Sequence, residues 1–213
     1  MLQPAIASGL AALELPNSPR LVGLLADYIG LLSRWNRVYN LTAVRDPLDM
    51  IERHLLDSLA VAPWLEGAAL LDVGSGAGLP GIPLAVLHPD RHFTLLDSNA
   101  KKTRFMIQVC AELGLQNVTV VQARVEQYQP VQAFDSILAR AFAPLDRLLT
   151  LTGHLCRAHG RILALKGPEA HHELEKLPPA WRVCGCHPLY IPGLSAERWL
   201  LHLEPSGSAT HLL

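Results

Sequence analysis

The sequence predicts an α/β fold in which a mostly parallel, seven-stranded sheet follows an N-terminal helical extension. From about residue 67 onward, short apolar runs alternate with stretches of helical periodicity, a pattern typical of a parallel sheet covered by helices on both faces. Before that point, apolar residues recur at spacings of three and four, which indicates amphipathic helices. We therefore divide the chain into a helical extension (1–66), a Rossmann-like domain (67–205) and a tail expected to be flexible (206–213).

The extension is expected to contain two helices. Pro19 opens the first, which runs to about Tyr39 with one apolar face. The second runs from Pro47 to Ala62, with Asp46 as its N-cap and Pro47 in the first turn, where a proline needs no N–H. Both helices therefore have an apolar side to bury against the domain that follows.

Five apolar runs are predicted to form the parallel part of the sheet, with helices between them. Two further runs near the C-terminus are separated by only a short link, so they do not continue the alternation of strand and helix. We expect them to form an antiparallel hairpin at the end of the sheet. The predicted strands are Ala68–Val73, Phe93–Leu96, Val118–Val121, Ser136–Ala139, Ile162–Leu165, Val183–Tyr190 and Arg198–Glu204, and the predicted helices of the domain are Gly81–Leu87, Lys101–Leu113 and Leu145–Ala158.

The composition excludes several classes of protein. No apolar run approaches the roughly 18 residues of a membrane span, and no basic segment precedes an apolar stretch at the N-terminus. We therefore expect neither membrane association nor a secretion signal. The four cysteines form no C-x-x-C pair, which is typical of reduced thiols in a cytoplasmic protein. The ten histidines are scattered, and the only adjacent pair, His171-His172, has no carboxylate or cysteine at ligand spacing beside it, so we expect no metal site.

The net charge of −1 bears on the kind of partner. A protein that holds nucleic acid mainly by charge is usually basic overall. If the substrate is RNA, binding must come from a local basic surface or from a larger assembly. The near-neutral charge favours a structured particle as substrate, because shape then adds to charge.

A glycine-rich loop follows the first predicted strand. Asp72 ends that strand, and Gly74, Gly76 and Gly78 follow at alternate positions. Glycine lets the chain turn sharply and lets a ligand approach the backbone, and the next helix points its free N–H groups at the loop. Asp97 ends the second strand, where an acid can accept hydrogen bonds from both ribose hydroxyls of an adenosine ligand. Loop and acid together predict an adenosine-containing cofactor.

Two kinds of cofactor fit this pattern. Nucleotide dehydrogenases use G-x-G-x-x-G, which Gly76–Gly81 matches letter for letter. That match starts two residues late relative to the strand, and it places Pro80 and Pro83 where a pyrophosphate needs N–H donors. S-adenosylmethionine carries no phosphate, and its loop follows a strand-end acid with glycines at alternate positions. We therefore predict S-adenosyl-L-methionine as the cofactor and a class I S-adenosylmethionine-dependent methyltransferase as the fold.

A more specific pattern is carried by six segments in a fixed order along the chain. Together they closely resemble the RsmG (GidB) family of bacterial small-subunit rRNA methyltransferases, and the resemblance extends from about Tyr28 to Lys166. The first 20 residues and the tail after Pro205 carry no such resemblance. The six segments are Asn40–Asp46, Arg53–Ser58, Asp72–Pro83, Leu96–Ser98, Arg140–Phe142 and Leu165–Gly167.

The resemblance implies an activity, a partner and a set of cofactor contacts. The activity is methylation of N7 of a guanine, position 527 of 16S rRNA, with S-adenosyl-L-methionine as donor. The partner is that rRNA within the small ribosomal subunit or its precursor, and the enzyme is expected to be a monomer. The implied cofactor-binding residues are Gly74 and Leu79 in the loop, Asp97 at the ribose, Val125 and Glu126 beside the adenine, and Arg140 at the end of the fourth strand. The loop pattern itself adds the other two glycines, Gly76 and Gly78.

The implied reaction needs no general base, because N7 carries a free lone pair at neutral pH and a sulfonium methyl group is already activated. We therefore assign no acid–base residue. The task of the protein is to align N7, the methyl carbon and sulfur, which can correspond to effective molarities on the order of 10⁵–10⁸ M. The candidates for positioning the substrate are Arg140 and Lys166 as donors to O6 or a phosphate, Phe142 as an aromatic ring on the cationic product base, and His54.

Several of these residues also have structural explanations. An ion pair with Asp72 or Glu126 also explains Arg140. An exposed position at a strand end also explains Lys166. An i,i+4 salt bridge is a structural explanation for Arg53 and Asp57. A solvated helix face is the structural explanation for Lys101–Arg104, and a phosphate-binding face is the functional one.

Two other functions stay open from the residues alone. A methyltransferase acting on another RNA or on a small molecule shares every cofactor feature, although the segment Arg53–Ser58 argues against it. A non-catalytic cofactor-binding module shares the loop but transfers no methyl group. Binding of the donor, or of its demethylated product, tests the second, and identification of the acceptor tests the first.

Overall fold

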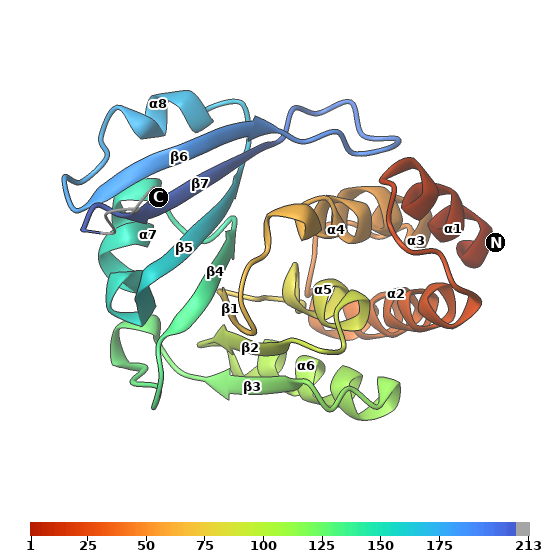
Figure 1. Ribbon diagram of the computed structural model, residues 1–213. Helices are drawn as coiled ribbons and strands as arrows, with labels where there is room; N and C mark the ends of the chain where they lie inside the picture. Colours follow the sequence, from red (N-terminus) through yellow and green to blue (C-terminus); the bar gives the residue numbers. More distant parts are fainter. Residues whose placement is uncertain (208–213) are drawn as a thin grey trace.

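One seven-stranded sheet forms the centre of the computed structural model, which describes residues 1–207 (Figure 1). The strand order is β3-β2-β1-β4-β5-β7-β6. The first five of these strands run parallel, whereas β7 pairs antiparallel with both β5 and β6. The fold class and the C-terminal hairpin are therefore as predicted. The strands are β1 (Ala69–Val73), β2 (His92–Asp97), β3 (Val118–Gln122), β4 (Phe134–Arg140), β5 (Cys156–Lys166), β6 (Trp181–Pro188) and β7 (Trp199–Pro205).

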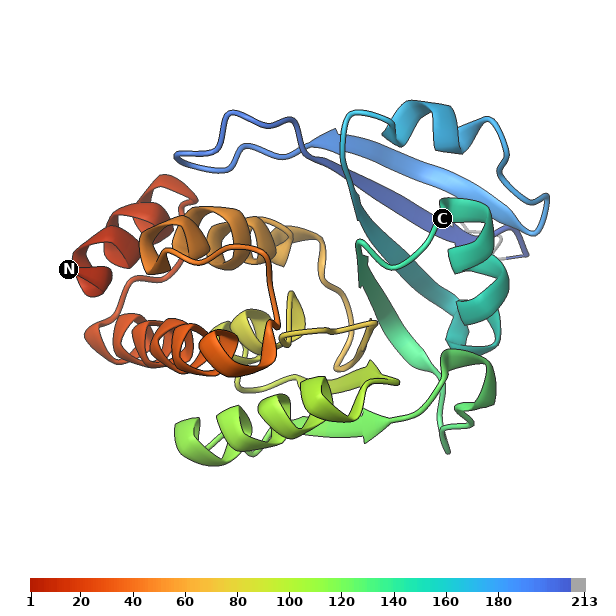
Figure 2. The same cartoon turned by 180° about the vertical axis from the view of Figure 1, so that it is seen from behind.

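Helices cover both faces of the sheet, and the N-terminal helices lie on the same face as α5 and α6 (Figures 1 and 2). Buried residues of this face form one continuous hydrophobic cluster that includes the N-terminal helices, so residues 1–66 share their core with the domain. A second cluster lies on the opposite face beneath α7. The helices are α1 (Leu2–Ala12), α2 (Pro19–Tyr39), α3 (Pro47–Met50), α4 (Asp57–Leu59), α5 (Gly81–Leu87), α6 (Ala100–Leu113), α7 (Leu145–Thr152) and α8 (Ala170–Leu174).

The two predicted N-terminal helices are present, but the second ends at Leu59 and not at Ala62, and its middle differs from an α-helix. Helix α2 has the predicted bounds, and Ser18 caps it by accepting the Leu21 N–H at 3.2 Å. Asp46 caps the second helix through two N–H groups, as predicted. Between α3 and α4, however, residues Ile51–Leu56 form a π-helical turn, η1. Such turns occur frequently at functional sites, and this one carries His54.

One predicted helix is too long. The sequence pattern predicts a helix from Leu145 to Ala158, but α7 ends at Thr152, a 3₁₀ turn follows, and β5 begins at Cys156. The Thr152 hydroxyl donates to the Leu148 carbonyl within the last turn. Cys156 then pairs with β4, so the sheet recruits residues whose local pattern is helical.

The β6–β7 hairpin and the residues that follow it contact distant parts of the chain. The connection between β6 and β7 reaches back to the N-terminal helices (Figure 2), where Arg198 pairs with Asp57. Of the predicted tail, Ser206 donates its N–H to the Ala180 carbonyl, and residues 208–213 lie outside the described part of the chain. Within residues 1–207, no helix has the length and apolar character needed to cross a membrane.

Candidate active site

The glycine loop is a compact turn at the carboxyl end of β1. Gly74, Gly76 and Gly78 have φ angles of 67°, 59° and 80°, a left-handed conformation that favours glycine. The N–H groups of Gly74 and Ser75 donate to the Leu96 carbonyl on β2 at 2.8 and 3.2 Å. The Gly78 N–H donates to the Ser75 carbonyl at 2.8 Å. The alternate glycines therefore set the shape of the loop, and β2 fixes its position.

Asp97 closes one side of the loop. Its Oδ2 accepts the Gly76 N–H at 2.9 Å, and its Oδ1 accepts the Asn99 N–H at 2.8 Å. The Lys102 Nζ lies 3.9 Å from Oδ2. The side chain is 8% exposed, and this remaining surface faces a cavity. Asp97 is therefore held rigidly at the edge of the cavity.

The cavity at the loop has a volume of about 420 Å³, within the range of small-molecule sites. It brings together Gly74, Asp97, Val125, Glu126 and Phe142, which the sequence analysis had selected for different reasons. Sequence reasoning named Ser98 and Lys102 only within a family segment and a possible phosphate-binding face, and it missed Arg124, Arg147 and Leu151. Arg124 follows β3, and Arg147 and Leu151 lie on α7, which follows β4, at the carboxyl end of the sheet where ligands bind.

Three predicted cofactor residues of the loop do not line this cavity. Leu79 is 4% exposed and packs in the hydrophobic core. A Cβ at Gly78 would overlap the Ile82 side chain, so Gly78 serves close packing of loop and helix. Gly76 contributes its N–H to Asp97. A direct cofactor contact for these residues stays a prediction, and their visible role is to shape the loop.

Phe142 lies between two cavities. It lines the cavity at the glycine loop and also a neighbouring cavity of about 350 Å³ that contains Lys166. Its ring packs so closely on the loop that a Cβ at Gly74 would be 2.5 Å from Phe142 Cδ2. The preceding residue, Ala141, has a φ of 49°, which is unusual for a residue other than glycine. The backbone thus bends sharply to place the ring between the two cavities.

Lys166 is engaged in a partly buried ion pair. Its Nζ donates to Glu173 Oε2 at 2.6 Å and to the Ala143 carbonyl at 2.9 Å. The same Glu173 oxygen accepts the Leu145 N–H at the start of α7. The side chain of Lys166 is 11% exposed, so the interpretation as a surface residue is wrong. The ammonium group is fixed beside the second cavity.

Arg140 leaves the end of β4 towards the N-terminal helices. Its Nη1 donates to Asp57 Oδ2 at 3.0 Å and to the Arg53 carbonyl at 3.3 Å. Asp57 Oδ1 accepts Arg198 Nε at 3.1 Å, and the Asp57 side chain is 3% exposed. The expected salt bridge between Arg53 and Asp57 is thus replaced by two long-range ion pairs. One buried carboxylate joins α4, β4 and the segment before β7.

Asp72 is buried directly beneath the loop. Arg140 was expected to pair with Asp72 or Glu126, but it pairs with neither, because Asp57 takes its guanidinium. Asp72 Oδ2 accepts the Gly81 N–H at 2.9 Å, whereas Oδ1 has no hydrogen-bond partner among residues 1–207. Burial raises the pKa of Asp72 to about 7, and the Gly81 N–H opposes this rise. The carboxyl group therefore anchors the first turn of α5.

His54 belongs to the support of the site. Its Nε2 lies 2.6 Å from Thr42 Oγ1, and its Nδ1 lies 2.8 Å from the Arg53 carbonyl, so Nδ1 carries the hydrogen and Nε2 accepts the threonine hydroxyl. Burial, followed by the charge of Arg140, lowers the pKa of His54 to about 4. The side chain stays neutral at physiological pH. It connects η1 to the loop that follows α2.

This pKa predicts a pH-dependent stability. An unfolded histidine binds a proton near pH 6.5, whereas folded His54 binds one only near pH 4, so acid favours the unfolded chain. We expect wild type to lose roughly 2–3 kcal/mol relative to His54→Gln between pH 7 and pH 4. Urea unfolding at several pH values measures this difference. Comparison with the variant removes the opposite contribution of Asp72, whose raised pKa makes stability fall as pH rises from 4 to 7. Parallel pH profiles for both proteins would contradict the assignment.

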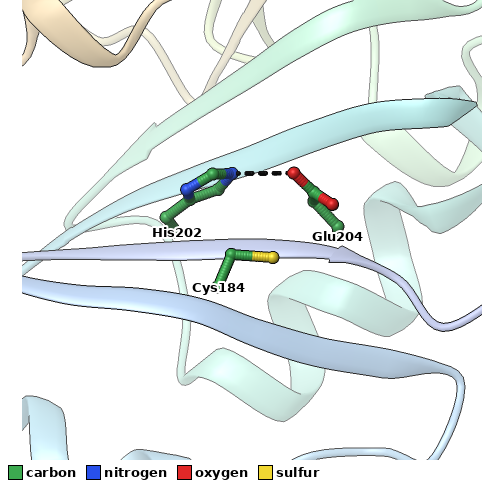
Figure 3. A group of neighbouring side chains, drawn as sticks. All are labelled: Cys184, His202 and Glu204. Atoms are coloured by element: carbon green, nitrogen blue, oxygen red, sulfur yellow. Dashed lines mark ion pairs between the residues drawn. The ribbon is translucent and has the colours of Figure 1, made fainter. Parts of the chain in front are cut away.

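A group of possible metal ligands lies elsewhere, on the hairpin of β6 and β7. Cys184, His202 and Glu204 have ligand atoms within 4.8 Å of one another (Figure 3). The Glu204 carboxylate pairs with His202 at 3.2 Å, with Arg182 at 2.5 Å and with Arg161 at 3.8 Å. Arg182, together with Arg161, which also pairs with Glu66, thus surrounds the carboxylate with positive charge. The arrangement favours an ion-pair network over a cation site.

Comparison with known proteins identifies the family. The profile described as rRNA small subunit methyltransferase G matches residues 22–201. The chain belongs to this family. A ribosomal RNA small subunit methyltransferase G from Stutzerimonas stutzeri is 52% identical over 201 residues, 93% of this chain and 94% of the relative. Another of the same name, from Alkalilimnicola ehrlichii, is 50% identical over 210 residues, 98% of this chain and 96% of the relative.

The family relationship also agrees with the fold. The structure of mitomycin 7-O-methyltransferase superimposes with a TM-score of 0.61 at 16% identity, covering 84% of this chain and 60% of that one. Such a low identity supports the fold alone. With the family, the predictions of a class I methyltransferase fold, of a methyltransferase and of S-adenosylmethionine as its cofactor are confirmed.

Proposed function

We propose that this family member methylates N7 of a guanine, position 527 of 16S rRNA, within the small ribosomal subunit or its precursor. The family description names rRNA of the small subunit as the acceptor, and its match over residues 22–201 carries the proposal. The guanine, the N7 atom and the particle come from the resemblance of six segments of the chain. We further propose that the protein acts as a monomer in the cytoplasm, where bacterial subunits are assembled.

The cavity at the glycine loop suits the methyl donor. S-adenosylmethionine, when bound, supplies an activated methyl group on a sulfonium. Asp97 presents a fixed carboxylate for the two ribose hydroxyls, and Val125 with Glu126 forms the wall for the adenine. Gly74 lines the cavity with its backbone, and its missing Cβ makes room for the Phe142 ring. These residues orient the donor and exclude water from its buried side.

The neighbouring cavity suits the acceptor base. Phe142 borders both cavities, so its ring is placed to stack on a guanine whose N7 faces the donor. Lys166 lies in the wall of this second cavity and donates towards O6 or a phosphate. Arg140 holds Asp57 through Nη1, which leaves its other guanidinium N–H groups for the substrate. No proton is moved, because N7 attacks with its own lone pair.

The test is to locate the methylated nucleotide. Small subunits from a strain lacking this activity are incubated with radiolabelled S-adenosylmethionine and the purified protein, and the labelled nucleotide is mapped by primer extension and nuclease digestion. Label on N7 of guanine 527 is expected. Label on another nucleotide, or on no RNA, would overturn the proposal.

The same assay tests the two cationic residues. We expect Arg140→Ala and Lys166→Ala each to lower kcat/KM for the subunit about 10-fold or more, because each removes a charge-assisted hydrogen bond. Arg20→Ala is the matched control, since Arg20 is exposed at the start of α2, in a different cavity. Full activity of both test variants would remove these residues from the acceptor site.

A further inference from the structure

The hydrogen bonds of the glycine loop have two different origins. Most come from the Rossmann-like part of the chain itself, namely from the Leu96 carbonyl, from Asp97 and from the turn of the loop. One comes from outside: the Tyr28 hydroxyl on α2 donates to the Ala77 carbonyl at 2.8 Å. Ala77 lies between Gly76 and Gly78, which both have positive φ angles. The N-terminal extension thus contacts the loop at the residue that lies between two glycines.

Tyr28 is suited to act as a permanent donor. Its side chain is 0% exposed, and burial raises the pKa of Tyr28 far above its usual range, so the hydroxyl keeps its proton. Arg140 and Asp72 act on it with opposing charges. An acceptor buried beside such a donor loses a hydrogen bond that water does not replace when the hydroxyl is removed.

Helix α2 is itself held on both sides of Tyr28. At its start, Ser18 caps the helix. Near its end, the Trp35 ring lies 5.6 Å from the Phe105 ring on α6, and the Asn36 amide donates to the Val44 carbonyl at 2.9 Å. The position of the Tyr28 hydroxyl is therefore set by a rigid element and not by the loop that it contacts.

We propose that Tyr28 is a positioning residue for the methyl donor: through the Ala77 carbonyl it holds the glycine loop in its binding conformation. The N-terminal helices are then part of the cofactor site, although they line none of its cavity. The proposal rests on the proposed function only in that this loop binds the donor. It adds a residue outside the six segments that carry the family resemblance, on a helix that shares a hydrophobic core with α5.

The test removes one hydroxyl group. Tyr28→Phe keeps the buried ring and deletes the donor. Tyr39→Phe is the control, since Tyr39 lies on the same helix, is 44% exposed and has its ring tilted against that of Trp35. Calorimetry with S-adenosylmethionine is expected to show a Kd about 5- to 10-fold higher for Tyr28→Phe, the effect of losing one buried hydrogen bond. Tyr39→Phe is expected to bind like wild type.

Two further readouts separate positioning from a purely structural role. In the methylation assay, Tyr28→Phe should raise the KM for the donor while kcat at saturating donor stays within about twofold, because only the unbound loop is loosened. Hydrogen exchange of the Gly78 amide, which is bonded to Ser75, should become faster in the free protein. A lower melting temperature with an unchanged Kd and unchanged exchange would overturn the proposal.

Failure of this proposal can be distinguished from failure of the proposed function. If the wild-type protein methylates another acceptor, the binding and exchange measurements keep their meaning, because they need no RNA. If the wild-type protein binds no S-adenosylmethionine, the proposed function fails. The exchange measurement alone then decides whether Tyr28 holds the loop.

Discussion

Replacing Asp97 by alanine is expected to weaken binding of S-adenosylmethionine about 100-fold, because two hydrogen bonds to a charged group, each contributing about 1.5 kcal/mol or more, are lost at the ribose. The carboxylate has a second task, since it also accepts the N–H groups of Gly76 and Asn99. Its removal therefore leaves the loop without one of its anchors. Both effects act in the same direction. Calorimetric titration with the donor measures the change.

A matched control is available at the other end of the sheet. Asp90 is an exposed acid that follows α5, and it does not line the cavity of Asp97. Asp90→Ala should therefore bind the donor as wild type does. Circular dichroism before each titration confirms that both variants are folded. A Kd for Asp97→Ala within threefold of wild type would show that the ribose is held elsewhere.

The second large effect is a loss of stability, expected when alanine replaces Gly81. A Cβ added at Gly81 would overlap the Leu95 side chain and lie 2.8 Å from Asp72 Oδ2. Leu95 and Asp72 are both 0% exposed, so neither has room to move away. Overpacking of such a site costs about 1–3 kcal/mol, and the Gly81 N–H that bonds Asp72 is displaced as well. We expect Gly81→Ala to lower the free energy of unfolding by about 3 kcal/mol.

The control for this prediction should change stability in the opposite direction. Gly23 lies within α2, and an added Cβ there meets nothing within 4 Å. Gly23→Ala is therefore expected to raise the free energy of unfolding by about 0.5–1 kcal/mol, because alanine loses less backbone entropy in a helix. Urea denaturation of both variants measures the two values. Equal effects at the two glycines would contradict the packing argument.

Some features of the fold depend on the local sequence, and others depend on residues far away in the chain. The parallel strands were predictable because buried β-strands appear as short apolar runs. The glycine loop was predictable because three glycines follow the first strand and acids lie near the ends of the first two strands. The end of α7 was not predictable from the pattern around Thr152. There the pairing of Cys156 with β4 outweighs local helical preference.

The ion pairs of the site were the hardest to predict. Sequence spacing suggests that Asp57 pairs with Arg53, four residues away on the same helix. The structure gives Asp57 two partners instead, Arg140 at a separation of 83 residues and Arg198 at 141. The residue spacing contains no information about such partners, because they depend on how η1, β4 and the connection before β7 pack together.

The sequence alone determined the fold class, the family, the methyl donor and the strand-end positions of residues that line the cavity, since these follow from periodicity, glycine spacing and ordered motifs. Only the tertiary structure decided which charges pair and which side chain holds the loop. The bond from Tyr28 to Ala77 joins residues 49 positions apart. A hydrogen bond or an ion pair needs its two groups within a few ångströms, and packing of the N-terminal helices on the sheet is what brings them to that distance.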